Sequence, residues 1–449
     1  MGATADLSDF ITRLSVERLP EAVVHQAKRC LMDWLGVTLA GSADPSVDVF
    51  LAVADDVAET PQATVLGCGR RAGLLHAVLT NGYMSHVLDF DDTFNPERTT
   101  VHGSAPVWPV VLGLSERDTI DGSLAITAFV AGFETEVRIA LAAGPAHYEA
   151  GWHVTGTVGH FGAAAAAAHV LRLRPEQTAS ALGAAGTQAA GLKGVYGSMG
   201  KALHPGKAAM DGLLSALLAA RGFDGSSSIL EAKHGFLSVL SPDPDPDLAI
   251  DGLDESWTLL EDGFKPYACG SLTHPTIEAV LDLRREHDVS PEDIVSLEAT
   301  VNDYVSWVTA KRKPGTGLEG KFSIYHCAAV AAVDGAASVR QFTDDRVSDP
   351  AVAAMRDKVS IVVDEALPKD AATVTIKIAD GRALSKTISH NKGTPSRPMS
   401  DDEIEAKFLD LAAERVGDEI ARRVAEICWN LEHQDDVGAI ARLCEGPPR

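Results

Sequence analysis

Apolar positions follow a helical period through the first two thirds of the chain. One predicted helix carries apolar residues on a single face, at Val24, Ala27, Leu31, Trp34 and Leu35. We expect this helix to end at Gly36, because glycine is a poor helix former that is common at helix ends. An alanine run at 161–169 predicts a buried helix against which other helices pack closely. The glycine-rich segment 183–206 predicts several turns and helix ends.

After about residue 265 the apolar period becomes that of β-strands. Apolar residues alternate in two segments, at Val295, Leu297, Ala299 and Val301 and again at Val374, Ile376 and Ile378. The β-branched run 359–363 predicts a further strand. Asp380-Gly381 predicts a tight hairpin turn that leads into a strand at 383–388. A helical pattern at 327–337 lies between these strands.

Helical periodicity returns near the C-terminus. Ser400 and Glu403 have the spacing of a capping box, and the apolar residues that follow share one helix face: Ile404, Phe408, Leu411 and Ala412. We therefore predict a mostly α protein with an α+β insert. It has a helical domain at 1–265, a smaller α+β domain at 266–395, and C-terminal helices at 396–449 that return to the helical domain. A length of 449 residues agrees with two domains rather than one core.

Charge narrows the possible partners. The chain has 39 basic and 63 acidic side chains, which gives a formal net charge of −24. This balance argues against binding to nucleic acid or to an anionic membrane surface. No apolar run approaches the roughly 18 residues of a membrane span. The first residues lack the basic and apolar regions of a signal peptide, so we expect a cytoplasmic protein.

The cysteines indicate neither a disulfide framework nor a metal centre. No two of them form a Cys-x-x-Cys pair or stand near histidines at zinc spacing. We expect reduced, mostly buried thiols at Cys30, Cys68, Cys269, Cys327, Cys428 and Cys444.

Two patterns that resemble nucleotide-binding loops are rejected. Residues 67–72 fit G-x-G-x-x-A, but no alternation of strands and helices surrounds them. Residues 194–201 resemble a phosphate loop only loosely, and Ala202 stands where serine or threonine would be needed.

Histidine, lysine and aspartate concentrate in four polar segments, at 86–104, 147–153, 201–207 and 264–274. Taken singly, such histidines are more often structural than catalytic, and Asp89, Asp91 and Asp92 also suit a helix cap. Cys269 is read as a small thiol lining a cleft rather than as a nucleophile. Only convergence of these segments in the fold would make a site.

Together these segments resemble the MmgE/PrpD family. The resemblance rests on Asp-Phe-Asp-Asp-Thr at 89–93, Gly-Trp-His at 151–153, Lys201-x-x-His204-x-Gly206, the Lys-Pro-Tyr motif at 265–274, and Gly-Lys-Phe-Ser at 320–323. Further matches lie at 31–36 and 392–408, so the motifs run in order across nearly the whole chain. Members of this family include 2-methylcitrate dehydratase, cis-aconitate decarboxylase and iminodisuccinate epimerase.

The resemblance implies a fold and a class of substrate. It implies a large helical domain, an α+β lid, a cleft between them, and a homodimer. It also implies a small anionic carboxylate as substrate and no metal or organic cofactor. The active-site positions that it implies are Asp89, Thr93, His102, His153, Lys201 and Lys265. Less direct matches place substrate-binding residues at Tyr148, His204, His274 and Cys269.

Two departures from the decarboxylase pattern stand out. The stretch between Asp89 and His102 is a few residues longer, so His102 is placed by its Val-His-Gly-Ser context. Gly270 stands five residues after Lys265, where that pattern has a histidine. This weakens the decarboxylase hypothesis.

The residue types suit chemistry beside a carboxylate. Lysine side chains such as Lys201 and Lys265 anchor carboxylates and stabilise developing negative charge. Histidine titrates near neutral pH and serves as base or acid. We therefore expect a dehydratase-like lyase in which one of His102 and His153 takes the α-proton and the other protonates the leaving hydroxyl.

Three other hypotheses stay open. An epimerase would use two bases on opposite faces of one carbon, with Tyr148 or Lys201 as one of them. A cis-aconitate-type decarboxylase and a non-catalytic binding protein with the same fold are less favoured.

Overall fold

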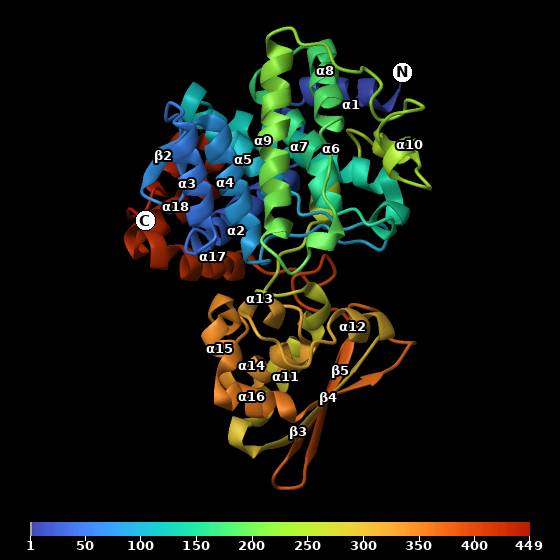
Figure 1. Cartoon of the computed structure of the whole chain (residues 1–449), viewed down its shortest axis with the longest axis vertical. Helices are drawn as coiled ribbons and strands as arrows, with labels where there is room; N and C mark the ends of the chain where they lie inside the picture. The colour runs from blue at the N-terminus through green and yellow to red at the C-terminus, as the bar shows by residue number, and fades with distance from the viewer. Residues whose placement is uncertain (1) are drawn as a thin grey trace. The chain divides into compact units, whose positions relative to one another are not determined.

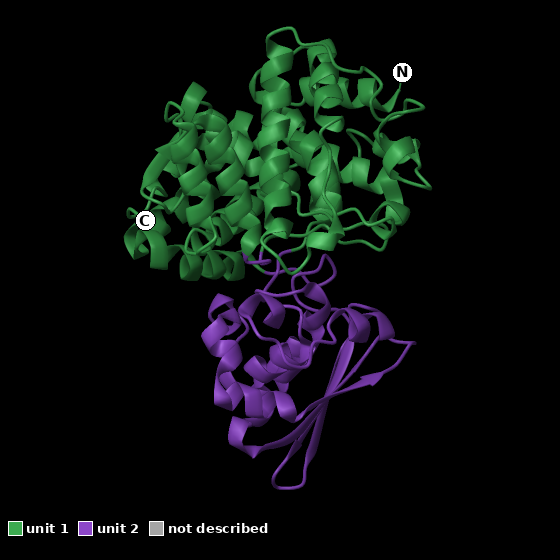
Figure 2. Cartoon of the chain, in the orientation of Figure 1, with its two compact units in different colours: residues 1–87, 91–263, 400–449 green, residues 88–90, 264–399 purple. Residues whose placement is uncertain are grey.

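The computed structural model describes residues 2–449 and divides them into two compact units (Figures 1 and 2). Unit 1 comprises the described residues up to Val87 together with Asp91–Gly263 and Ser400–Arg449. Unit 2 comprises Leu88–Phe90 and Phe264–Met399. The predicted fold class is confirmed, because unit 1 is almost entirely helical and unit 2 contains a mixed sheet with helices.

Unit 1 is a bundle of helices with one short hairpin. Its helices are α1 (Ala3–Arg13), α2 (Glu21–Gly41), α3 (Val47–Val57), α4 (Leu74–Val87), α5 (Ser104–Asp118), α6 (Gly122–Glu149), α7 (Val154–Val170), α8 (Pro175–Gly186), α9 (Gly200–Ala220), α10 (Phe236–Leu240), α17 (Asp401–Val416), α18 (Asp418–Trp429) and α19 (Gly438–Leu443). The hairpin pairs β1 (Ala63–Val65) with β2 (Arg70–Ala72). This hairpin carries the rejected G-x-G-x-x-A pattern, so no dinucleotide-binding unit surrounds it.

Helix α7 is the centre of unit 1. All 17 of its residues are buried, and it packs between α6 and α9 (Figure 1). The alanine run confirms the prediction of a buried helix, since its small side chains allow neighbouring backbones to approach. Helix α7 therefore gives the segments at its N-terminal end a fixed position in the bundle.

Unit 2 is built on a four-stranded sheet in the order β4-β3-β5-β6. The strands are β3 (Ile294–Val301), β4 (Val359–Val363), β5 (Ala372–Ile378) and β6 (Ala383–Ile388); β3 and β4 are parallel, and the other pairs are antiparallel. The helices are α11 (His274–His287), α12 (Asp303–Val308), α13 (Gly317–Gly320), α14 (Ile324–Asp334), α15 (Asp344–Ser348) and α16 (Pro350–Asp357). Helix α11 packs on β5, β6 and α14 (Figure 1).

Three local predictions were wrong, each for a reason that depends on packing or backbone geometry. Helix α2 runs through Gly36 to Gly41, because Gly36 serves a close contact: a Cβ there would lie 3.2 Å from Cα of Phe408. Helix α14 stops at Asp334, since Gly335 adopts φ 68° and caps it. Val295 is 56% exposed, because the register shifts between Ile294 and Ser296 and Ile294 takes the buried position.

Other predictions hold. The capping box of Ser400 and Glu403 begins α17. All six cysteines are buried free thiols. Within residues 2–449, no helix combines the length and the apolar character needed to cross a membrane.

Helices α4 and α9 cross at two glycines. A Cβ at Gly82 would lie 2.8 Å from Cα of Gly206, and a Cβ at Gly206 would lie 2.9 Å from the backbone nitrogen of Tyr83. Neither position has room for a side chain unless the helices separate. The crossing therefore fixes the distance of α9 from α4.

We expect Gly206→Ala to lower the free energy of unfolding by about 1–3 kcal/mol, because the added methyl group overpacks the crossing. The measurement is equilibrium unfolding in urea. Gly194→Ala is the matched control, since a Cβ there meets no atom within 4 Å. Equal stability of the two variants would contradict the tight crossing.

Candidate active site

Three of the candidate residues, Asp89, Thr93 and His102, lie on the segment between α4 and α5. It begins after Val87 and ends at Ser104. The backbone of Asp89 is left-handed, with φ 53°, a conformation that aspartate tolerates better than most residues. The acidic residues that follow, Asp91 and Asp92, are both completely buried.

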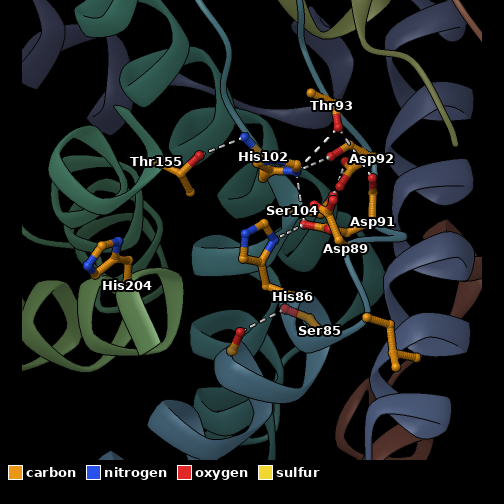
Figure 3. A network of polar contacts seen from close by, with 12 residues as sticks. Ser85, His86, Asp89, Asp91, Asp92, Thr93, His102, Ser104, Thr155 and His204 are labelled. Carbon is orange, nitrogen blue, oxygen red and sulfur yellow. Dashed lines mark hydrogen bonds and ion pairs between the residues drawn. The ribbon is translucent and has the colours of Figure 1, made fainter. Parts of the chain in front are cut away.

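Asp91 lies between two histidines (Figure 3). Its Oδ2 atom is 2.8 Å from Nδ1 of His86, in the last turn of α4, and 3.1 Å from Nδ1 of His102. Burial acts to raise the pKa of Asp91, but the two histidines outweigh burial and hold that pKa well below its usual value. Burial lowers the pKa of His86 to about 4, against the attraction of Asp91. At neutral pH the carboxylate is therefore ionised and the His86 ring is neutral.

The contacts of His102 place a proton on its Nδ1 atom. This nitrogen is 3.0 Å from the carbonyl oxygen of Asp92 and 3.2 Å from Oγ1 of Thr93, besides its contact with Asp91. A carbonyl oxygen and an ionised carboxylate only accept hydrogen bonds, so Nδ1 is the donor. The same carboxylate makes Nδ1 of His86 a donor as well. Each ring therefore turns its Nε2 atom away from Asp91.

Asp92 belongs to a second buried group of acids. Its Oδ2 atom accepts a hydrogen bond of 2.5 Å from Oγ of Ser104. Burial and the Asp33 and Asp91 carboxylates raise the pKa of Asp92 to about 7, although its hydrogen bonds oppose the rise. Burial and the neighbouring Asp92 also raise the pKa of Asp262 well above its usual value. The Asp92–Asp262 pair therefore retains a proton at neutral pH.

Two groups of buried side chains are close enough to hold a metal ion, because the ligand atoms in each group lie within 4.8 Å of one another. The first group is His86, Asp91 and His102. The second group is Cys30, Asp92 and Asp262. In the first group a metal would need the lone pair of His102 Nδ1, but that nitrogen faces the Asp92 carbonyl oxygen. In the second group the pair of raised pKa values favours a shared proton. Both groups fit hydrogen bonding better than metal coordination.

His153 and Lys201 lie beside these histidines. His153 precedes α7, and the centre of its ring is 5.9 Å from that of His86; the His86 and His102 centres are 4.4 Å apart. Burial first, and then the charge of Lys201 and the nearby histidines, lower the pKa of His153 well below its usual value. Lys201, in the first turn of α9, also lowers the pKa of His86. A cation thus acts on two neutral rings at once.

Unit 2 holds four of the candidate residues. Nζ of Lys265 is 3.1 Å from Oδ1 of Asp89 and 3.0 Å from its carbonyl oxygen. Sγ of Cys269 is 3.2 Å from Oγ1 of Thr273, and Nε2 of His274 is 3.2 Å from the carbonyl oxygen of Cys269. Burial opposes ionisation of Cys269, but hydrogen bonds from Cys327 and His274 outweigh it and hold its pKa well below the usual value.

The sequence-predicted residues therefore form groups within each unit. Unit 1 brings together Thr93, His102, His153, Lys201 and His204; unit 2 pairs Asp89 with Lys265 and Cys269 with His274. Tyr148 lies against a different residue: the ammonium of Lys193 is 3.5 Å from the centre of its ring.

Sequence reasoning missed three residues of the unit 1 group. His86 and Asp91 stand in the 86–104 segment, whose polar character was the one available signal. Tyr196 meets the His153 ring edge-on at 5.5 Å and lies 5.8 Å from Nζ of Lys201. No motif pointed to Tyr196, because its segment is irregular.

Fold and site together define a protein with a helical unit, an α+β unit, and a buried histidine–carboxylate cluster beside a lysine. Residues 5–249 match the MmgE/PrpD N-terminal domain, and residues 267–433 match the MmgE/PrpD C-terminal domain. The chain belongs to the MmgE/PrpD family.

Curated relatives match the chain over nearly its whole length. It is 27% identical to a cis-aconitate decarboxylase of Aspergillus terreus, over 99% of this chain and 96% of the relative. It is 28% identical to the cis-aconitate decarboxylase-like protein oryM of Aspergillus oryzae, over 99% and 97%. It is 26% identical to the cis-aconitate decarboxylase of Homo sapiens, over 99% and 95%.

We expect Asp91→Asn to lower the free energy of unfolding at pH 6 by about 2–3 kcal/mol, because it removes the charged acceptor of two buried N–H groups. Asp92→Asn is the matched variant. With a pKa of about 7, Asp92 is mostly protonated at pH 6, so the neutral amide should cost less than about 1 kcal/mol. Urea unfolding of both variants checks this contrast; equal losses would mean that the two acids do not differ in charge.

Proposed function

We propose that this chain is a lyase that acts on a small tricarboxylate. The observation that carries the proposal is the cluster of buried histidines His86, His102 and His153 beside Lys201, within unit 1. The names of the curated relatives, which are cis-aconitate decarboxylases, support a tricarboxylate as substrate and a lyase as the class of enzyme.

The proposed chemistry follows from the charges of this cluster. Loss of carbon dioxide from an unsaturated tricarboxylate breaks a carbon–carbon bond and leaves its electron pair on the substrate. The ammonium of Lys201 would stabilise that negative charge, and a low-dielectric site would strengthen the effect. A histidine that carries a proton on Nε2 would then deliver it to the substrate carbon. We propose His153 for this step, since Lys201 is the largest influence after burial that lowers the pKa of this ring.

We propose decarboxylation as the first candidate reaction, on the strength of the relatives' names. Gly270 supplies no imidazole, and a Cβ there would lie 3.2 Å from Cδ1 of Phe322, so a larger side chain would require that ring to shift. The decarboxylase hypothesis therefore relies on the histidines of unit 1. Lys265, which pairs with Asp89 within unit 2, stays a predicted carboxylate anchor.

Dehydration of a hydroxylated tricarboxylate is the second candidate. Two histidines on separate segments, His102 before α5 and His153 before α7, suit the base and the acid that elimination needs. The epimerase alternative has no support among these relatives, and Tyr148, its proposed second base, lies against Lys193. The homodimer, the absence of a cofactor and the cytoplasmic location stay predictions.

Proton NMR in deuterated water separates the reactions, with chelator-treated protein and cis-aconitate, citrate or 2-methylcitrate. Decarboxylation of cis-aconitate would give new vinyl signals together with carbon dioxide. Dehydration of citrate or 2-methylcitrate would give vinyl signals without it. We expect the first result; turnover of none of these compounds would contradict the proposed substrate class.

In the same assay we expect Lys201→Met to lower kcat/KM by about 100-fold or more, because a cation aimed at developing charge contributes on that scale. The control is Lys233→Met, which removes an exposed lysine of unit 1. Similar activity of the two variants would contradict the proposed role of Lys201 in stabilising the negative charge.

A further inference from the structure

His153 also contacts another histidine, His204. Nδ1 of His153 is 2.8 Å from Nδ1 of His204, which lies on α9 and is set apart from the Asp91 group in Figure 3. Two ring nitrogens at this distance form a hydrogen bond only when one carries a hydrogen and the other a lone pair. One proton therefore lies between the rings, and its position determines the state of both outer Nε2 atoms.

Two glycines fix the position of the His204 ring. A Cβ at Gly156, in the first turn of α7, would lie 3.0 Å from Cβ of His204, and a Cβ at Gly191 would lie 3.2 Å from its Nδ1 atom. The backbone of Gly191 also accepts a hydrogen bond of 2.9 Å from the backbone N–H of His153. The backbone at these two glycines therefore packs directly against His204 and keeps the two rings in contact.

The helix that carries His204 also carries a charged residue, Lys207. Nζ of Lys207 is 2.6 Å from Oδ2 of Asp211 and 3.1 Å from Nε2 of His160. The Lys207 side chain is 35% exposed, whereas that of Asp211 is 9% exposed. After burial, Lys207 is the largest influence that lowers the pKa of His204, to about 4. His204 is therefore neutral at neutral pH and lies within the field of an ammonium that water can reach.

We propose that His204 is a positioning residue that sets the tautomer of His153 and passes a proton to it through the contact between their Nδ1 atoms. This inference rests on the proposed lyase function. It explains how His153 can give up a proton at Nε2 and recover one at Nδ1.

The proton transfer balances without any further reactant. At the start His153 carries its hydrogen on Nε2 and His204 carries its hydrogen on Nδ1. When Nε2 of His153 protonates the substrate carbon, the proton on His204 Nδ1 crosses to His153 Nδ1. Nε2 of His204 takes a proton from solvent, so this ring stays neutral. Both rings end neutral with exchanged tautomers, and they return to the starting tautomers when water refills the site.

Substitutions at position 204 separate positioning from simple packing. His204→Asn keeps an amide near the place of Nδ1 but cannot carry a proton through, so we expect kcat to fall about 10- to 100-fold while KM stays within about twofold. In His204→Gly, added imidazole should restore part of the lost kcat. The control Lys233→Met, at an exposed lysine, should leave kcat unchanged. Unchanged kcat in His204→Asn, or a rise in KM with no imidazole rescue, would overturn the proposal.

A measurement that needs no turnover keeps this proposal distinct from the proposed function. Ring 15N NMR of the unliganded full chain should show scalar coupling between Nδ1 of His153 and Nδ1 of His204, which His204→Asn abolishes. Coupling in a protein that turns over no tricarboxylate would refute the lyase assignment and leave the histidine pair intact. Absence of coupling would refute the pair, whatever the activity.

Discussion

A buried, ionised carboxylate is the interaction on which the arrangement of the histidines in unit 1 depends. An isolated charge in the interior is strongly unfavourable, so Asp91 is stable there only because two imidazole N–H groups donate to it. The same hydrogen bonds fix the tautomers of His86 and His102 and turn both Nε2 atoms away from the acid. Stability and chemical orientation in this region therefore have one physical cause.

Other buried carboxylates of unit 1 are stabilised in two ways, by an ion pair or by keeping a proton. Asp33 forms a buried ion pair of 2.7 Å with Lys407. Asp92 and Asp262 hold a proton, because burial and mutual repulsion raise the pKa of each. Burial also raises the pKa of Glu136 well above its usual value. Asp91 differs from these carboxylates because it stays ionised with two histidines as its partners. Its protonation state therefore controls the histidines.

The sequence predicted local structure well wherever one segment decides it. The alanine run of α7, the alternating strands of unit 2 and the capping box at Ser400 each follow from neighbouring residues. The prediction from sequence failed where a residue distant in the chain determines the local structure, as at Gly36, which packs against Phe408. The same distinction applies to the candidate active site. Family motifs pointed to His102, His153 and Lys201, but Asp91 gains its role from a left-handed turn at Asp89 and two rings that only the fold brings to it.

The ring 15N shifts of His86, followed from pH 7 to pH 5 in the wild type and in Asp91→Asn, test the central claim most directly. An ionised Asp91 predicts a hydrogen on Nδ1 and a bare Nε2 in the wild type throughout this range, because the pKa of His86 lies at about 4. Asp91 is also what opposes the fall of that pKa, so Asp91→Asn should lower it further. A wild-type ring that carries its hydrogen on Nε2, or that becomes doubly protonated near pH 6, would contradict the account.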